Sequence, residues 1–216
     1  EGLGLRDEQV EDKTEAVLSD ARRTLLGAEQ ESWLFDNLRG SQQSGTRWRL
    51  LGQQILFSPL TPPGTPVQNT DVWDGYPAAR ERVFDMLAND RIADVAILTG
   101  DIHSSWALDV PRTPWSGYNP GTGAGSRAVE IVTPAVSSPP MFSSASLRDS
   151  AKLLLTTAGH VKFLDGDSRG YVLLDIGPDR LLADWYFVPT VTERTDRESR
   201  AAGFVCDRGS SRLVRQ

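Results

Sequence analysis

Hydrophobic positions in the first ninety residues recur mainly at helical spacing. From Thr24 the pattern fits one face of a helix, and Gly40-Ser41 ends it. The positions on this face are Leu25, Leu26, Gln30, Trp33, Leu34 and Leu38. A second amphipathic pattern spans 77–91 (PAARERVFDMLANDR), with Pro77 at a favourable first-turn position. The pattern therefore predicts two helices before position 92.

Shorter apolar runs predict strands. WRLLGQQILF (48–57) is typical of a half-buried strand, and a proline-rich loop follows it. The apolar run 95–99 comes shortly after the second helix, and AVEIVTPAV (128–136) is a further strand. GYVLLDIG and RLLADWYFV predict paired strands that turn at 177–179. A helix followed directly by a strand is typical of an α/β protein.

Polar or charged segments separate these elements. Residues 1 to about 20 are acid-rich and predict a mobile arm or a marginal helix. Loops rich in Gly, Pro and Ser span 111–127 and 137–150, and a short helix is expected near 150–158. After Pro189 the composition becomes charged again, which predicts an edge segment and a loose terminus.

Composition narrows the function. The chain has 216 residues, of which 39% are hydrophobic, enough for the core of one domain. Its net charge of -6 argues against a nucleic-acid-binding surface, and no apolar run is long enough to span a membrane. An acidic protein that handles phosphates needs local positive charge, for instance from metal ions. The single cysteine, Cys206, excludes internal disulfides and Cys-rich zinc modules.

The first stretch with candidate chemistry is Gly100-Asp101-Ile102-His103, which follows the apolar run 95–99. Ligands of α/β sheets bind beyond the carboxyl ends of strands. In an extended chain, Asp101 and His103 would point to the same face and could bind Zn, Fe or Mn. The alternative is that Asp101 caps the next element and that His103 is a half-buried histidine whose hydrogen bonds are made within the protein.

A second stretch, DVWDGYP (71–77), precedes the helix that contains Arg80. Asp74 could cap the turn that leads into this helix. Alternatively, Trp73 or Tyr76 could form the wall of a pocket, with Arg80 as an anion binder.

The third stretch is HVKFLDGDSRGY (160–171), which contains His160 and Arg169. Its Asp-Gly-Asp sequence does not have the spacing of an EF-hand loop. We expect a polar hairpin here that leads into the strand from Tyr171.

Taken in order, five stretches resemble the carboxyl-terminal half of PhoD-like alkaline phosphatases/phosphodiesterases. They are RTLLGAEQESWLFDNL, WRLLGQQILFSPL, DVWDGYPAARERV, ILTGDIHSSW and HVKFLDGDSRGYVLLDI. The resemblance implies an α/β fold that is part of a four-layer αββα metallophosphoesterase sandwich with mixed sheets. It also implies a flexible connector at 1–22, the carboxyl-terminal half of the metallophosphatase domain at 23–190, and an edge segment and tail at 191–216.

The resemblance implies metal-dependent hydrolysis of phosphate esters, with iron and calcium as the metals and zinc or manganese as alternatives. Asp101 and His103 match the last metal motif of the family and become the expected catalytic metal ligands. The expected substrate-binding residues, whose roles the resemblance leaves open, are Trp73, Asp74, Tyr76, Arg80, His160 and Arg169.

The remaining metal ligands of this family come from an amino-terminal half whose motifs are absent here. Two protein ligands cannot fill two ions that each need about four to six. We therefore expect a second polypeptide that carries this half, and a secreted, cell-surface or periplasmic location. The alternative is a non-catalytic domain that binds a phosphorylated ligand or a sugar through Trp73 and Tyr76.

Overall fold

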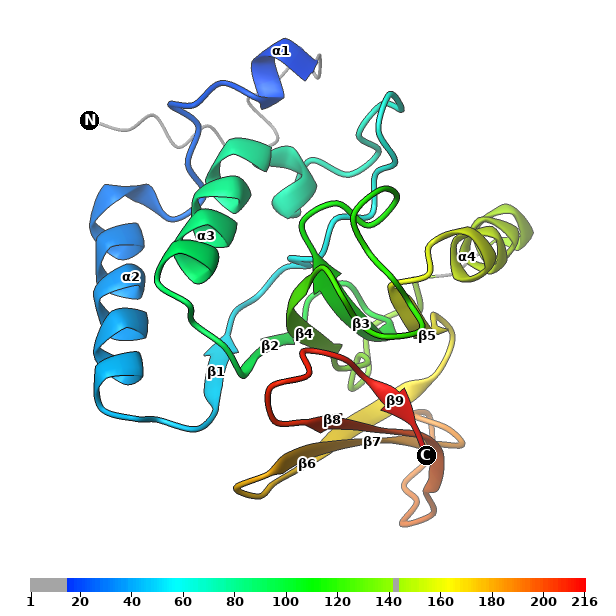
Figure 1. Ribbon diagram of the computed structural model, residues 1–216. Helices are drawn as coiled ribbons and strands as arrows, with labels where there is room; N and C mark the ends of the chain where they lie inside the picture. Colours follow the sequence, from blue (N-terminus) through cyan, green and yellow to red (C-terminus); the bar gives the residue numbers. More distant parts are fainter. Residues whose placement is uncertain (1–14, 142–143) are drawn as a thin grey trace.

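The described part of the protein consists of three layers of secondary structure (Figure 1). The computed structural model describes residues 15–141 and 144–216. Helices cover one face of a mixed sheet, and an antiparallel sheet lies on its other face. The predicted α/β class with a mixed sheet is confirmed. Most of the expected connector 1–22 lies outside the described residues, and its described end contains the short helix α1 (Glu15–Leu18).

Sheet A is the mixed sheet, with the strand order β1-β2-β4-β3-β5. Its strands are β1 (Arg49–Gly52), β2 (Val95–Thr99), β3 (Ser105–Pro111), β4 (Ser126–Val132) and β5 (Val161–Asp165). Strands β1, β2 and β4 are parallel, and β3 is antiparallel to both of its neighbours. Because parallel strands end at the same edge of a sheet, the segments after β1 and β2 meet there. The N–H of Gly100 donates to the carbonyl of Gln54 at 3.1 Å.

Sheet B is antiparallel, with the order β6-β7-β8-β9. Its strands are β6 (Arg169–Ile176), β7 (Arg180–Val188), β8 (Ser199–Asp207) and β9 (Val214–Arg215). The predicted pairing of β6 with β7 is confirmed. The loose terminus expected after Pro189 is wrong, because β8 is an interior strand that buries Phe204 and Cys206. Charged residues before and after β8 hid its alternating apolar positions from the sequence analysis.

The two sheets pack face to face through a core of apolar side chains that both sheets supply. The residues of this core include Ala96, Ala107, Val129, Ile131, Leu181, Ala183, Trp185 and Phe204. Trp185 is fully buried, and its Nε1–H donates to the carbonyl of Val132 at 3.0 Å. This bond links a strand of sheet B to a strand of sheet A and fixes how the sheets stack.

Helices α2 (Gly27–Gln43) and α3 (Pro77–Asn89) cover the outer face of sheet A (Figure 1). The predicted 77–91 helix is confirmed, whereas α2 continues past the expected stop at Gly40-Ser41. Its last turn is held from outside the helix, because Arg49 donates to Ser41 Oγ and to Gln42 Oε1, each at 2.7 Å. The predicted short helix is α4 (Ala145–Thr157), which lies beside β5 and begins earlier than expected.

Two predicted strands are shorter than expected, and β3 was missed as well as β8. The 48–57 strand ends at Gly52, and the 128–136 strand ends at Val132. Strand β3 was missed because Asp109 interrupts its apolar run. In the structure this buried carboxylate accepts hydrogen bonds from the N–H of Leu213 at 2.7 Å and the hydroxyl of Tyr118 at 2.6 Å, which offset the cost of burying it.

The polar hairpin expected at 160–171 is also wrong. Strand β5 pairs with β3 in sheet A, whereas β6 pairs with β7 in sheet B. The intervening residues carry the chain from one sheet to the other. Asp165 accepts hydrogen bonds from the N–H groups of Asp167 and Ser168, so this turn is held locally.

The contact of Trp185 with sheet A leads to a stability prediction. Trp185→Phe removes the donor to the Val132 carbonyl and leaves a small cavity, so we expect the free energy of unfolding to fall by about 2–3 kcal/mol. The matched control is Trp33→Phe, since Trp33 is 63% exposed and its replacement should change stability by less than about 0.5 kcal/mol. Urea unfolding of both variants measures the difference, and equal losses would contradict the proposed role.

Candidate functional site

The candidate metal ligands lie in a tight loop directly after β2. The N–H of Ile102 donates to the carbonyl of Gly100 at 2.7 Å, which closes a three-residue turn around Asp101. Asp101 has φ 63° and His103 has φ 56°. The expectation that this segment stays extended is therefore wrong, because both residues adopt the left-handed conformation.

The side chains of Asp101 and His103 are exposed, and within the described residues neither has a hydrogen-bond or ion-pair partner. Asp101 does not cap the next element, and His103 is not half-buried. Left-handed non-glycine residues cost about 1–3 kcal/mol each and concentrate at functional sites. Arg91, Asp94 and Ser211 are also left-handed, but Asp101 and His103, with one residue between them, together present an exposed carboxylate and an exposed imidazole.

The base of this loop is anchored by a chain of buried hydrogen bonds. Thr99 Oγ1 donates to Glu130 Oε1 and accepts from Gln53 Nε2, each at 2.6 Å. The N–H of Thr133 donates to the Thr99 carbonyl at 2.9 Å. These bonds connect three neighbouring strands of sheet A and hold the residue two positions before Asp101.

Glu130 is a site-supporting residue that the sequence analysis missed. Its fully buried carboxylate accepts hydrogen bonds from the N–H groups of Phe57 and Ser58, both at 2.8 Å. Burial raises the pKa of Glu130 to about 6, although the bonds from Thr99, Phe57 and Ser58 favour the charged form. A glutamate within the apolar run AVEIV was the signal, because a buried carboxylate needs several donors.

Asp74 and Arg80 support the segment after β1. Asp74 Oδ2 accepts from the N–H of Thr61 at 2.8 Å, from its hydroxyl at 2.7 Å and from the N–H of Leu60 at 3.2 Å. Its other oxygen pairs with Arg80, which also donates to the Phe57 carbonyl. Asp74 caps neither α3 nor the turn Trp73–Gly75 that leads into it, because both begin without a side-chain cap. These contacts favour the structural interpretation, and a substrate contact of either residue stays a prediction.

Trp73 and Tyr76 lie in the core beside this same segment. Trp73 Nε1–H donates to Gln53 Oε1 at 3.2 Å, and its ring contacts Phe57 edge-on. Tyr76 is buried beneath the guanidinium of Arg23, which lies 4.7 Å from the ring centroid. Both residues are therefore buried, and the prediction that one of them forms a pocket wall is confirmed for Trp73, which lines a cavity between α2 and β1.

His160 and Arg169 also bond to loops. His160 Nε2 lies 2.8 Å from the Pro59 carbonyl, which only accepts, so this nitrogen carries the proton. Its Nδ1 is buried without a partner in the described structure. Burial, outweighing the Pro59 contact, lowers the pKa of His160 to about 4. Arg169 donates to the carbonyls of Ser138 and Asp167 at the start of β6.

The structure thus separates the sequence candidates into two sets. Asp101 and His103 point outward, whereas the side chains of Trp73, Asp74, Arg80 and His160 converge on the segment 53–61 that follows β1. Across the described ranges, no group of three or more His, Cys, Asp or Glu side chains could hold a metal ion. Asp101 and His103 have the right donor atoms for a metal, but they supply only one oxygen and one nitrogen ligand group.

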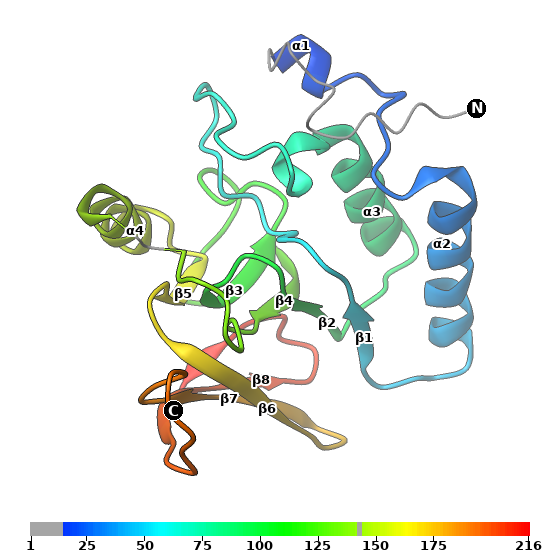
Figure 2. The ribbon, with the colours of Figure 1, turned by 180° about the vertical axis from the view of Figure 1, so that it is seen from behind.

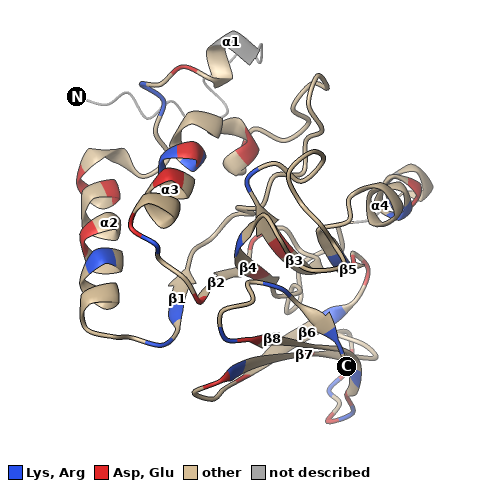
Figure 3. Cartoon of the chain, viewed as in Figure 1, with Lys and Arg blue, Asp and Glu red and all other residues tan. Residues whose placement is uncertain are grey.

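Two further observations bear on partners. Lys and Arg are interspersed with Asp and Glu along the helices and strands rather than gathered on one element (Figure 3). No helix within the described residues is long and apolar enough to cross a membrane.

The burial of His160 predicts a specific pH dependence. Its folded pKa of about 4 lies below the ordinary 6.5, so folding favours the neutral ring. The resulting stability is complete above pH 6.5 and is lost as pH falls toward 4, by about 3 kcal/mol. We expect the free energy of unfolding of the wild type to fall more steeply over this window than that of His160→Gln, since the other titrating groups are common to both. Parallel pH profiles in urea unfolding would contradict the assignment.

The comparisons with known proteins agree with one another. The family model described as "PhoD-like phosphatase" matches residues 4–185. Alkaline phosphatase D of Bacillus subtilis (strain 168) is 34% identical over an alignment 218 positions long, which covers 96% of this chain and 35% of that protein. A solved structure described as "Structure of PhoD" superposes with a TM-score of 0.77 at 30% identity and covers 94% of this chain and 37% of that one. The chain spans about a third of the length of these relatives, and it belongs to the PhoD-like phosphatase family.

Proposed function

We propose that the chain carries part of the active site of a metal-dependent enzyme that hydrolyses phosphate esters, either monoesters or diesters. The observation that carries this proposal is the loop after β2, where Asp101 and His103 are held in left-handed conformations with unpaired side chains. The membership of the chain in a phosphatase family supports the choice of reaction.

In this proposal the Asp101 carboxylate and the His103 imidazole hold metal ions, iron with calcium by family resemblance and zinc or manganese as alternatives. Such ions, when bound, neutralise phosphoryl oxygens and lower the pKa of a bound water. Water contributes the new P–O bond, and the alcohol leaves with the proton that balances the cleaved P–O bond. The chain's own contribution is to fix its two ligands through Thr99 and Glu130.

The proposal also requires a further polypeptide segment, because two ligand residues are too few for a metal cluster. Strand β1 is an edge strand whose outer side has no partner in the part of the chain that the structure describes. On it, Leu50 is 45% exposed. An open apolar edge of this kind favours the addition of another strand.

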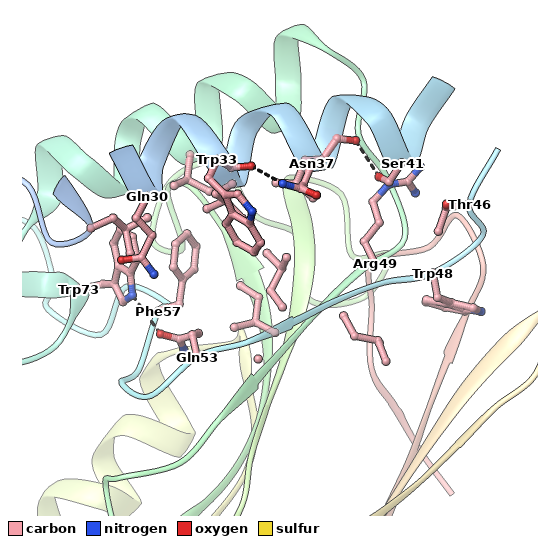
Figure 4. A pocket seen from close by; sticks show the side chains of 18 residues that line it. Gln30, Trp33, Asn37, Ser41, Thr46, Trp48, Arg49, Gln53, Phe57 and Trp73 are labelled. Atoms are coloured by element: carbon pink, nitrogen blue, oxygen red, sulfur yellow. Dashed lines mark hydrogen bonds between the residues drawn. The ribbon is translucent and has the colours of Figure 1, made fainter. Parts of the chain in front are cut away.

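A groove beside β1 supports the same conclusion. Helix α2 and β1 enclose a cavity of about 330 Å³, with Gln30, Trp33 and Asn37 on one side and Arg49 and Gln53 on the other (Figure 4). Its remaining lining is mostly apolar, so a hydrophobic segment would fill it.

The edge of sheet B opens on the same side of the molecule. The hairpin at the end of β6 points to the side of the molecule where β1 lies (Figure 2), and Trp48 before β1 donates to the Gly177 carbonyl after β6 at 2.9 Å. Gly52 and Gln53 of sheet A and Val172 and Leu174 of β6 line a cavity of about 350 Å³ between the two sheets. We infer that the remaining part of the catalytic unit, and with it the fourth layer of the predicted sandwich, docks at these two edges. The family resemblance also leads us to propose a secreted, cell-surface or periplasmic enzyme.

The alternative of a non-catalytic phospho-ligand or sugar-binding domain places the ligand on the loop with Trp73 and Tyr76. Trp73 lines the cavity between α2 and β1, but both residues are at most 6% exposed, so they offer a ligand little surface.

The proposed ligands predict the effect of two substitutions. In the intact phosphatase, Asp101→Asn or His103→Ala should lower kcat/KM for phosphate esters by more than about 100-fold. Loss of a residue that only supports a ligand typically costs about 10–100-fold, and each of these substitutions removes a proposed ligand itself. Metal analysis should show less bound metal per protein in each variant. The control is Asp149→Asn on α4, an exposed aspartate that should retain wild-type activity and metal content. Unchanged activity in either ligand variant would contradict the proposal.

The proposed docking edge predicts a difference between two exposed leucines. Leu50→Lys places a charge on the open edge of β1, so we expect it to weaken binding of the separately produced remaining polypeptide by at least about 10-fold. Leu153→Lys on α4 is the matched control, since Leu153 is 63% exposed and lies away from both edges. Titration calorimetry of the two parts measures this, and equal affinities would overturn the docking edge.

A further inference from the structure

Another cavity lies beside the loop that contains the candidate ligands. It has a volume of about 290 Å³, close to the smallest ligand pockets. Its walls come from the segment 60–72, from Ile102, from Trp106 on β3 and from Met141. Ile102 lies between Asp101 and His103 in sequence, so its Cα is about 3.8 Å from the Cα of each. The cavity therefore adjoins the candidate metal site.

The lining of this cavity is apolar. Its apolar residues are Leu56, Leu60, Pro62, Pro66, Val72, Ile102, Trp106 and Met141. The indole Nε1–H of Trp106 is not available to a ligand, because it donates to Ser104 Oγ at 2.7 Å. No Lys or Arg lines the cavity, so it has no group that would hold a phosphoryl anion.

The polar residues of the lining are already engaged with the protein. Thr61 donates to Asp74, and Thr65 donates to the Pro62 carbonyl at 2.6 Å. Gln68 donates to the Pro66 carbonyl, and the Asn69 side chain accepts from the N–H of Asp71. Asp74, the one charged residue, pairs with Arg80. The cavity therefore offers dispersion contacts and the exclusion of water, with little hydrogen bonding.

From this arrangement we propose that the cavity binds the apolar organic group of the phosphate ester while the phosphoryl group lies at the Asp101 and His103 loop. This inference rests on the proposed function and adds a substrate class to it, namely phosphate esters of alkyl alcohols. The turn around Asp101 contributes to both parts of this proposed site. Asp101 and His103 are exposed and face the phosphoryl group in this proposal, while Ile102 forms a wall of the cavity for the alkyl group. A longer alkyl group gains burial in the cavity up to the length that fills it.

The test uses the intact phosphatase with methyl, butyl and hexyl phosphate, whose alcohols have similar leaving-group reactivity. We expect kcat/KM to rise by up to about four-fold per methylene from methyl to butyl phosphate, the increase that full burial of a methylene gives. A flat profile with measurable hydrolysis overturns the apolar subsite alone. Absence of hydrolysis for every ester overturns the proposed function and this inference together.

Variants at Leu60 test the location of the subsite. Leu60→Trp fills the cavity and should lower the ratio of kcat/KM for butyl over methyl phosphate by about 10-fold, whereas Leu60→Ala should move the preference toward hexyl phosphate. Thr65→Trp lies at the exposed rim of the cavity, so it leaves the core unchanged. We expect it to lower the same butyl-over-methyl ratio as Leu60→Trp does. The matched control is Leu153→Trp on α4, which should keep the wild-type ratio. An equal ratio in the Leu60, Thr65 and Leu153 variants would overturn the assignment.

Discussion

The buried carboxylate of Glu130 is the interaction on which the candidate site depends. It accepts hydrogen bonds from two backbone N–H groups after β1 and from the hydroxyl of Thr99 at the end of β2. Because a buried carboxylate is costly without donors, the segments after both strands must converge on it. That convergence places the Asp101 turn over the carboxyl-terminal edge of sheet A. A loss of Glu130 would therefore leave three donors unsatisfied and would free the base of the loop.

The segment 53–61 after β1 explains why several polar side chains near the candidate site are buried. Asp74 accepts from Thr61, Arg80 donates to Phe57, and His160 donates to Pro59, each from a different element. Beyond the backbone bonds of Gln53, Gln54 and Leu56, buried side chains supply the hydrogen bonds of this segment within the described residues. Rigid support of this kind suits the proposed roles of Asp101 and His103, because both lie on a loop rather than on a regular strand.

The sequence predicted elements well where local patterns were strong. The helix Pro77–Asn89, the strand Val95–Thr99 and the β6–β7 pair follow from periodicity and turn residues alone. It failed where a buried charge interrupted an apolar run, as Asp109 does in β3, or where charged neighbours disguised a strand, as in β8. It also could not distinguish a hairpin at 160–171 from a crossover, because sheet membership depends on distant partners.

The sequence by itself determined the family, the fold class and the two side chains that follow β2. Those depend on residue types and their spacing, which are local properties. Only the tertiary structure decided that Asp101 and His103 are left-handed and unpaired, while Trp73, Asp74, Arg80 and His160 support a loop from inside. The difference arises because burial and hydrogen-bond partners are set by residues far away in sequence, such as Glu130 for Phe57. Nothing in a single stretch of sequence records those contacts.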